Sequence, residues 1–540
     1  MVRFGPGKRA ATAVMAATIG MLTPGAAVAA AQPPAAPPPG QGMAVPPPVD
    51  LSALPSGSGK PDKTYEKKTE CVTRSLGENI IPKEIPWGQQ YLRLDDVHRL
   101  MQAETGGIGI DPQTKQPIRV AVIDTGVHNH PWFGHPVQGG GDYVKEENRG
   151  LEDCDGHGTE VAGIIGAKTP NDVGFRGVAP DSQIVSIRQS SQNYQEAEKT
   201  SSPAAPPPSS SGAPPSSSGG APPSSSSEAP PEEGGGAQPG GDGTEPGQQG
   251  GGRQIEDNGT AAGTVGTLAH SVRTAADTEG VKVINMSVDN CRKASGGPRT
   301  ASESELQAAV RYAVEQKNIV VVAAAGNTSE ACPQNNQPDP NQPISIVNPP
   351  WFRDDVLSVA AIDQTGSVAQ FSVNGPWVSV AAPGTKIISL DPAPGSTPSL
   401  ANLTIEGGKP QEIQGTSFAA PYVAGLAVLV RAKFPHLNAR QVMARIMQTA
   451  QHPGAHGGRD QFVGYGMINP MAALTAALPS EQGFPPAQNM TIPSDLPPAD
   501  NTDDTPMIVA LAGAGGGLVI LLITMFVMHT LRRNDPERSA

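Results

Sequence analysis

Between residues 86 and 478, short apolar runs alternate with longer segments in which apolar residues recur at helical spacing. The runs are rich in Val, Ile and Ala and too short for helices, so they predict buried strands at 118–123, 184–187, 281–287, 319–324, 356–361 and 379–384. The helical pattern predicts helices at 91–100, from 156, at 260–276, at 304–316, from 415 and at 439–450. Alternating strands and helices indicate a parallel sheet with helices on both faces, an α/β fold.

Residues 1–31 have the pattern of a signal peptide, because basic residues precede an apolar run and a small-residue cleavage site. An uncleaved anchor is the alternative, which the short run and its small residues disfavour. Residues 32–85 form an N-terminal extension. Up to residue 59 it is rich in Pro, Gly and Ala and is expected to be extended and mobile. The rest is charged and contains Cys71, and we expect it to be tied to the main domain.

Residues 197–252 are almost wholly Ser, Pro, Gly and Ala with scattered acidic residues, and they show no apolar periodicity. Such a composition cannot bury enough apolar surface to offset the entropy of ordering it. We therefore expect a disordered insertion within a domain that spans 86–478. A passive surface loop is the simplest interpretation of this insertion.

The chain continues with a second linker and a long apolar segment. Residues 479–506 are rich in Pro, Asp and Asn, and residues 507–531 contain no Asp, Glu, Lys or Arg. The apolar segment exceeds the ~20 residues that cross a bilayer as a helix, so we expect one C-terminal transmembrane helix. Arg532 and Arg533 follow it. Because positive charge flanks membrane helices on the cytoplasmic side, residues 532–540 are expected to form a cytoplasmic tail.

The net charge excludes one class of partner, and the cysteines indicate how the chain is cross-linked. The formal net charge of −13 argues against nucleic acid, because phosphate binding needs clustered Lys and Arg. Four cysteines in an exported chain favour two disulfides over a metal site, and they allow three pairings. Cys291 and Cys332 each follow a predicted strand. If these strands are neighbours, the two cysteines meet at one sheet edge, which leaves Cys71 with Cys154.

Three polar residues, Asp124, Ser287 and Asn327, follow predicted strands, so they lie at the carboxyl edge of the sheet, where ligands bind in such folds. Asp124 opens an Asp-Thr-Gly turn, where a carboxylate can hold an imidazole in one tautomer. The alternatives are a simple turn aspartate and one half of an aspartic-protease pair, which needs two carboxylates although the motif occurs once. The Asn327 amide could bind an oxyanion, or this residue is an asparagine of a turn.

Two further side chains stand at predicted helix starts. His157 lies between glycines, where little bulk blocks approach, and could act as a general base. A structural histidine is the alternative. Cys154 nearby suggests zinc, but no further Cys/His cluster has ligand spacing, so we predict no metal and no cofactor. Ser417 is either a nucleophile, which would need such a base, or a helix N-cap.

These residues occur in the order Asp, His, Asn, Ser within four motifs: VIDTG at 122–126, HGTEVAG at 157–163, AAGN at 324–327 and GTSFAAP at 415–421. The motifs resemble the signature sites of the subtilase family of serine peptidases, and the resemblance covers about 86–478 apart from the insertion. It implies a subtilisin-like fold and a serine endopeptidase that acts on protein or peptide substrates. It also implies Asp124 as orienting acid, His157 as base, Ser417 as nucleophile and Asn327 as oxyanion donor.

The flanking segments resemble those of the mycosins, the membrane-anchored subtilases of mycobacterial type VII secretion systems. This implies type VII secretion membrane components as partners and an inner-membrane location, with the catalytic domain on the periplasmic side. A structural scaffold with secondary proteolysis is the alternative function. Two features depart from ordinary subtilases. The extension is too short for a folded inhibitory pro-domain, and VDNC at 288–291 replaces the glycines that shape the substrate cleft.

Overall fold

The computed structural model describes residues 43–197, 253–254, 261–296, 299–393, 398–406, 408–482 and 505–533. The expected signal peptide, nearly all of the insertion, most of the second linker and most of the C-terminal tail lie outside these ranges. The chain divides into two compact units, Met1–Ala477 and Leu478–Ala540, and each is described by itself.

A parallel seven-stranded sheet is the centre of the first unit, in the order β14-β13-β11-β9-β3-β5-β4. Its strands are β3 (Arg119–Asp124), β4 (Gln138–Asp142), β5 (Gln183–Arg188), β9 (Val281–Met286), β11 (Val320–Ala324), β13 (Leu357–Ile362) and β14 (Val380–Pro383). Six of them coincide with the predicted apolar runs, and the predicted parallel α/β fold is confirmed. The sequence analysis missed β4, whose sequence QGGGD has no apolar pattern and which pairs only with β5 at the edge of the sheet.

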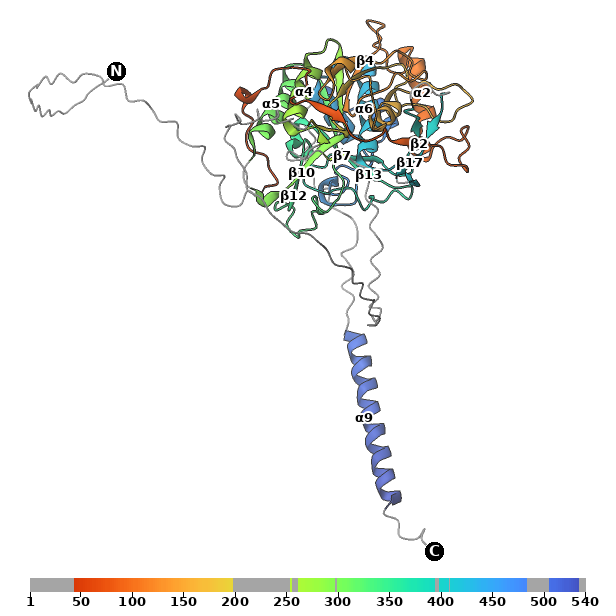
Figure 1. Ribbon diagram of the computed structural model, residues 1–540. Coiled ribbons are helices and arrows are strands. Elements are labelled where there is room, and N and C mark those ends of the chain that lie inside the picture. Colours follow the sequence, from red (N-terminus) through yellow and green to blue (C-terminus); the bar gives the residue numbers. More distant parts are fainter. Residues whose placement is uncertain are drawn as a thin grey trace, which may run out of the picture. The chain divides into compact units, whose positions relative to one another are not determined.

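Two pairs of helices pack against this sheet. Helices α3 (His157–Gly166) and α6 (Thr416–Lys433) contact each other and the central strands, as do α4 (Val265–Asp277) and α5 (Ala301–Glu315). Figure 1 shows α4 and α5, in green, to one side of α6. Every residue of α3 and nearly every residue of α6 is buried. Small residues make this possible: a Cβ on Gly425 would lie 2.5 Å from the Cβ of Val178.

The remaining elements of the first unit are shorter. The helix predicted at 91–100 is two helices, because Arg93 has a left-handed backbone (φ 54°) that separates them. The helices are α1 (Trp87–Tyr91), α2 (Leu94–Thr105), α7 (Ala439–Gln448) and α8 (Pro470–Thr475), with 3-10 helices η1 (Leu51–Ala53), η2 (Glu146–Asn148), η3 (Ala294–Gly296), η4 (Pro350–Asp355) and η5 (His456–Gly458). Small sheets contain β1 (Tyr65–Lys67), β2 (Thr73–Ser75), β6 (Ser191–Glu196), β7 (Arg253–Gln254), β8 (Ala261–Ala262), β10 (Val288–Lys293), β12 (Ser345–Asn348), β15 (Ser389–Leu390), β16 (Leu400–Ala401), β17 (Leu403–Glu406) and β18 (Lys409–Glu412).

The N-terminal extension lies on the domain from residue 43 onward. Strand β1 pairs with β6, and β2 pairs with β17, both antiparallel. The Pro-rich part, expected to be mobile, is packed where the structure describes it: Ala44 is buried, and the indole Nε1 of Trp351 donates to the carbonyl oxygen of Met43 at 2.8 Å. These contacts join residues about 300 positions apart, so the composition of the extension alone could not reveal them.

Two disulfides are present, Cys71–Cys154 and Cys291–Cys332, which is the pairing expected from the sequence. The positions predicted for Cys291 and Cys332 are correct in part. Strands β9 and β11 are indeed neighbours, but Cys291 lies within β10, a further strand that pairs with β12, rather than in a loop.

In the second unit, η6 (Pro479–Gln482) precedes a single long helix, α9 (Thr505–Arg533). Within α9, Val509–Arg532 has a mean hydropathy of 2.2 and is long enough to cross a bilayer. The predicted C-terminal apolar helix is therefore confirmed as a helix.

Candidate active site

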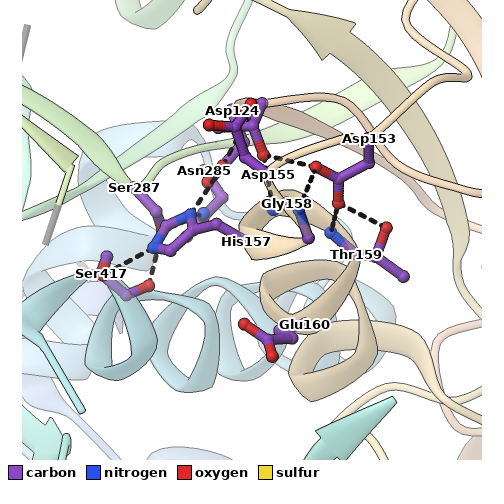
Figure 2. Close-up of polar contacts among 12 residues, drawn as sticks. Asp124, Asp153, Asp155, His157, Gly158, Thr159, Glu160, Asn285, Ser287 and Ser417 are labelled. Atoms are coloured by element: carbon purple, nitrogen blue, oxygen red, sulfur yellow. Dashed lines mark hydrogen bonds and ion pairs between the residues drawn. The ribbon is translucent and has the colours of Figure 1, made fainter. Parts of the chain in front are cut away.

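Three side chains from separate elements meet at the carboxyl edge of the sheet. Asp124 is the last residue of β3, His157 the first of α3 and Ser417 the second of α6. The Nδ1 atom of His157 lies 2.7 Å from Asp124 Oδ1, and its Nε2 lies 2.9 Å from Ser417 Oγ (Figure 2). All three are buried, with exposed fractions of 0%, 5% and 1%. The imidazole therefore bridges a carboxylate and a hydroxyl in a site with little water.

Close backbone packing sets the distance between Asp124 and His157. A Cβ on Gly158 would lie 2.0 Å from the carbonyl oxygen of Gly126, so the turn after β3 and the start of α3 can approach only because residue 158 is glycine. Gly156, which precedes α3, has a left-handed backbone with φ 78°. The glycines on both sides of His157 are thus required by the geometry that places its ring.

Asp153 stabilises the positions of Asp124 and His157 through hydrogen bonds, and the sequence analysis did not identify it. Its Oδ1 accepts hydrogen bonds from Thr125 Oγ1 at 2.7 Å and Gly156 N at 2.8 Å. Its Oδ2 accepts from the backbone N of Thr159 at 2.8 Å (Figure 2). One carboxylate therefore joins the turn after Asp124 to the first turn of α3. An acidic residue just before a predicted helix start was the signal available.

The start of α6 is fixed by a second set of contacts. Ser287 Oγ donates to the carbonyl oxygen of Ser417 at 2.7 Å, and Asn285 Nδ2 donates to Ser287 Oγ at 2.9 Å. The N-cap of α6 is Gly415, so the N-cap alternative for Ser417 is wrong. Its hydroxyl instead faces His157, and the ring of Phe418 packs beside that imidazole with centroids 4.9 Å apart.

Asn327 contacts the start of the nucleophile helix. Its Oδ1 accepts from the backbone N of Thr416 at 3.0 Å, and Thr416 Oγ1 accepts from Gly326 N at 3.2 Å. The amide is therefore oriented with its oxygen toward the helix start, which turns Nδ2 the other way. The expectation that Nδ2 and the backbone N–H of Ser417 bind one oxyanion stays a prediction.

The segment after Ser287 is a strand. In β10, Val288 and Asp289 pair in parallel with Arg253 and Gln254 of β7. Asp289 is 1% exposed, its Oδ1 accepts no hydrogen bond from the described residues, and burial raises the pKa of its carboxyl to about 8. A buried carboxyl group with a raised pKa thus lies two residues from Ser287, whose hydroxyl donates to the carbonyl oxygen of Ser417.

The described ranges contain no group of three or more His, Cys, Asp or Glu side chains arranged to hold a metal ion. Cys154, which suggested zinc beside His157, is bonded to Cys71 instead.

Comparison with known proteins agrees with this geometry. Residues 115–466 match the subtilase family. The chain is 34% identical to Mycosin-1 of Mycolicibacterium smegmatis, covering 86% of this chain and 90% of the relative, and 35% identical to Mycosin-1 of Mycobacterium tuberculosis, covering 88% and 92%.

Solved structures give the same result. A crystal structure of MycP1 from Mycobacterium smegmatis aligns with a TM-score of 0.63 at 34% identity, over 83% of this chain and 99% of that one. A chain in the structure of an intact ESX-5 inner membrane complex aligns with a TM-score of 0.62 at 30% identity, over 90% and 99%. The chain therefore belongs to the subtilase family of serine peptidases, in its mycosin branch.

Proposed function

We propose that Ser417, His157 and Asp124 form the catalytic triad of a membrane-tethered endopeptidase. The observation that carries the proposal is the imidazole of His157, placed 2.9 Å from Ser417 Oγ and 2.7 Å from Asp124 Oδ1. Ser417 Oγ attacks the carbonyl carbon of the peptide bond while His157 Nε2 takes the hydroxyl proton. Asp124 accepts the Nδ1 proton in a hydrogen bond and stabilises the imidazolium that forms.

The negative charge of the tetrahedral intermediate falls on the former carbonyl oxygen. Asn327 Nδ2 and the backbone N–H of Ser417, at the start of an 18-residue helix, are the donors that we assign to it. His157 then gives its proton to the leaving amine, and water hydrolyses the acyl group on Ser417 by the same steps in reverse. The substrate class is a protein or peptide.

We further propose that α9 anchors the chain in the inner membrane, with the catalytic domain on the periplasmic side. Its apolar length and the Arg532-Arg533 pair that follows support this orientation. Type VII secretion membrane components are the proposed partners. One aligned relative is described as an essential component of the type VII (ESX-1) secretion system, and others are part of the ESX-5 inner membrane complex.

A scaffold role is the second candidate function. The observation in its favour is that aligned relatives occur inside an assembled inner membrane complex. Residues 197–252, proposed as an insertion, are acidic and follow β6. We propose them as a spacer that a partner of the membrane complex contacts.

The test compares Ser417→Ala with a full deletion, and scores proteolysis and secretion in both. Ser417→Ala should abolish peptide cleavage and covalent labelling by a serine-directed phosphonate. Labelling that persists in Ser417→Ala would place the nucleophile elsewhere. Secretion that survives in Ser417→Ala and is lost in the deletion would favour the scaffold.

A matched variant addresses the insertion. Replacing residues 197–252 by a short Gly/Ser bridge should leave folding and peptidase activity intact, because loop closure costs little more with length. The same variant should co-purify less with the membrane complex. Unchanged recovery of the complex would leave the insertion a spacer without a partner.

A further inference from the structure

The N-terminal extension contacts the backbone just before His157. The disulfide joins Cys71 to Cys154, and the backbone N of Val72 donates to the carbonyl oxygen of Cys154 at 2.9 Å. Arg74, in β2, donates from Nη2 to the carbonyl oxygen of Asp155 at 2.9 Å. A segment that precedes the domain in sequence is thus fastened within three residues of the proposed base.

The same arginine also reaches the helix on the other side of His157. Arg74 Nε lies 2.7 Å from Glu160 Oε1, and the two side chains are 7% and 0% exposed. Glu160 is on α3, three residues after His157, so the two side chains share one face of the helix, one turn apart (Figure 2). Burial raises the pKa of Glu160, and the guanidinium of Arg74 acts in the opposite direction.

The groups around His157 are mainly acidic. Asp124 bonds it from β3, Asp153 and Asp155 lie in the loop before α3, and Glu160 lies on α3 itself. From α6 it contacts the hydroxyl of Ser417 and the ring of Phe418. Arg74 brings a positive charge to this group, and its interactions with Glu160, Asp153 and Asp155 are all favourable.

We propose that Arg74 is a positioning residue for His157: it pairs with Glu160 one turn away and counters the negative charge around the imidazole, so that His157 can act as a base. The N-terminal extension would then contribute to catalysis through Arg74 as well as to stability. The inference rests on the proposed function, because it requires His157 to be the base. Loss of the guanidinium removes a positive charge from a group of carboxyl side chains that includes Asp153 and Asp155 as well as Glu160, so an imidazolium forms more easily, and an imidazolium cannot accept the proton of Ser417.

The same contacts could serve only to attach the extension. A buried ion pair contributes little net stability compared with apolar residues of similar volume, so attachment alone does not require one. The disulfide and the β2–β17 pairing already fasten this segment. The experiment must therefore measure something that attachment does not change, and the pH dependence of turnover is such a measurement.

The test measures kcat and KM against pH for the full chain in detergent, with a fluorogenic peptide that the wild type cleaves. In Arg74→Met, the acid limb of the kcat profile should move up by about one pH unit, which is about a tenfold loss below the limb. Activity should recover toward the wild type in alkaline solution. KM should not change, because Arg74 contacts buried groups of the protein itself.

Three variants complete the design. Arg74→Lys keeps the positive charge, so the acid limb of its kcat profile should stay at the wild-type pH. Arg74→Met/Glu160→Gln removes both charges and should return the limb to the wild-type pH. Arg311→Met is the control: it removes an ion pair between Arg311, whose side chain is 32% exposed, and the buried Asp355, which Arg440 also contacts, and it should lower stability without moving the acid limb.

The inference would be overturned if the acid limb of the kcat profile in Arg74→Met stayed at the wild-type pH. It would also be overturned if the limb in Arg74→Met/Glu160→Gln moved as far as it does in Arg74→Met. A loss of turnover that is the same at every pH and follows the unfolded fraction would also overturn it, since that is the result of attachment alone. These outcomes are separate from a failure of the proposed function, which would appear as activity that survives in Ser417→Ala.

Discussion

The catalytic edge of the sheet and the N-terminal extension lie against each other but are held by different forces. At the catalytic edge, Asp124, His157 and Ser417 are placed by β3, α3 and α6, which are buried almost completely. The described part of the extension, 43–85, contains two strands of three residues and one short 3-10 helix. It is held by strand pairing, a disulfide and individual hydrogen bonds.

The two regions are therefore expected to respond differently to substitutions. In the catalytic edge, the spacing of a few atoms is set by packing that cannot relax without moving the reacting groups. In the extension, each contact adds to stability and can be lost by itself. We therefore expect substitutions at the edge to change turnover by orders of magnitude, and most substitutions in the extension to change stability by a few kcal/mol.

Among substitutions that keep both Ser417 and His157, the largest effect is expected for Asp124→Asn. An amide at this position favours the wrong tautomer of His157 and cannot stabilise the imidazolium, so kcat should fall by about 10⁴ while the fold is kept. The control is Asp62→Asn in the extension, where the carboxylate accepts a hydrogen bond from Tyr65 Oη at 2.7 Å, and this variant should keep full activity. Near-normal turnover in Asp124→Asn would place the orienting group elsewhere.

The sequence predicted this edge well, because its determinants are local. Apolar runs mark the strands, and Asp124 and Asn327 follow them directly. The shared edge then follows from the parallel sheet. What the sequence could not give is the set of supporting contacts, such as Asp153 with Thr125 and Thr159, because a short acidic segment allows many hydrogen-bond patterns.

Asn327 provides the second comparison, because its Oδ1 binds Thr416 N whereas its Nδ2 is predicted to bind the oxyanion. Asn327→Ala should lower kcat by about 10²–10³ with little change in KM, as expected for a donor used only in the transition state. Asn327→Asp keeps an acceptor for Thr416 N but replaces the donor by an oxygen. It should lose at least as much activity, and a variant with normal kcat would exclude the oxyanion role.

The extension illustrates what the sequence could not predict. Met43 contacts Trp351, and Arg74 contacts Glu160, so its partners lie far along the chain. Its own residues are Pro-rich or charged and carry no periodic apolar pattern. Composition therefore predicted a mobile segment up to residue 59, where side chains of the domain in fact hold the backbone.

The two disulfides allow the extension and the domain to be compared by the free energy of unfolding, because one bridge joins the extension to the domain and the other lies within the domain. Replacing Cys71 and Cys154 by Ser should lower the free energy of unfolding by about 2–4 kcal/mol in denaturant titrations. The bridged residues are 83 positions apart, against 41 for Cys291 and Cys332. Because each doubling of loop length adds about 0.6 kcal/mol, the first bridge should stabilise more than the second by about that amount. The reverse order would mean that native-state contacts, rather than the unfolded chain, set the difference.

The effect expected at Asp289 has the opposite sign and is confined to part of the pH range. The folded-state pKa of about 8 lies above the usual value for an aspartate, so the folded chain binds a proton that the unfolded chain has released. Stability is therefore lost as pH rises from about 4 to about 8. Asp289→Asn does not titrate and should gain stability relative to the wild type progressively across this window, by about 1.4 kcal/mol for each pH unit between the two pKa values.

Near pH 4 the advantage of Asp289→Asn should become small, because about half of the unfolded chains then carry the proton that the folded chain binds. Thermal or denaturant unfolding of the two proteins at pH 4, 6 and 8 measures the difference directly. A constant difference across the three pH values would show that the carboxyl group is charged in the folded chain. A growing difference would mean that the catalytic edge, unlike the extension, retains a group that costs stability, beside the serine that holds the backbone of Ser417.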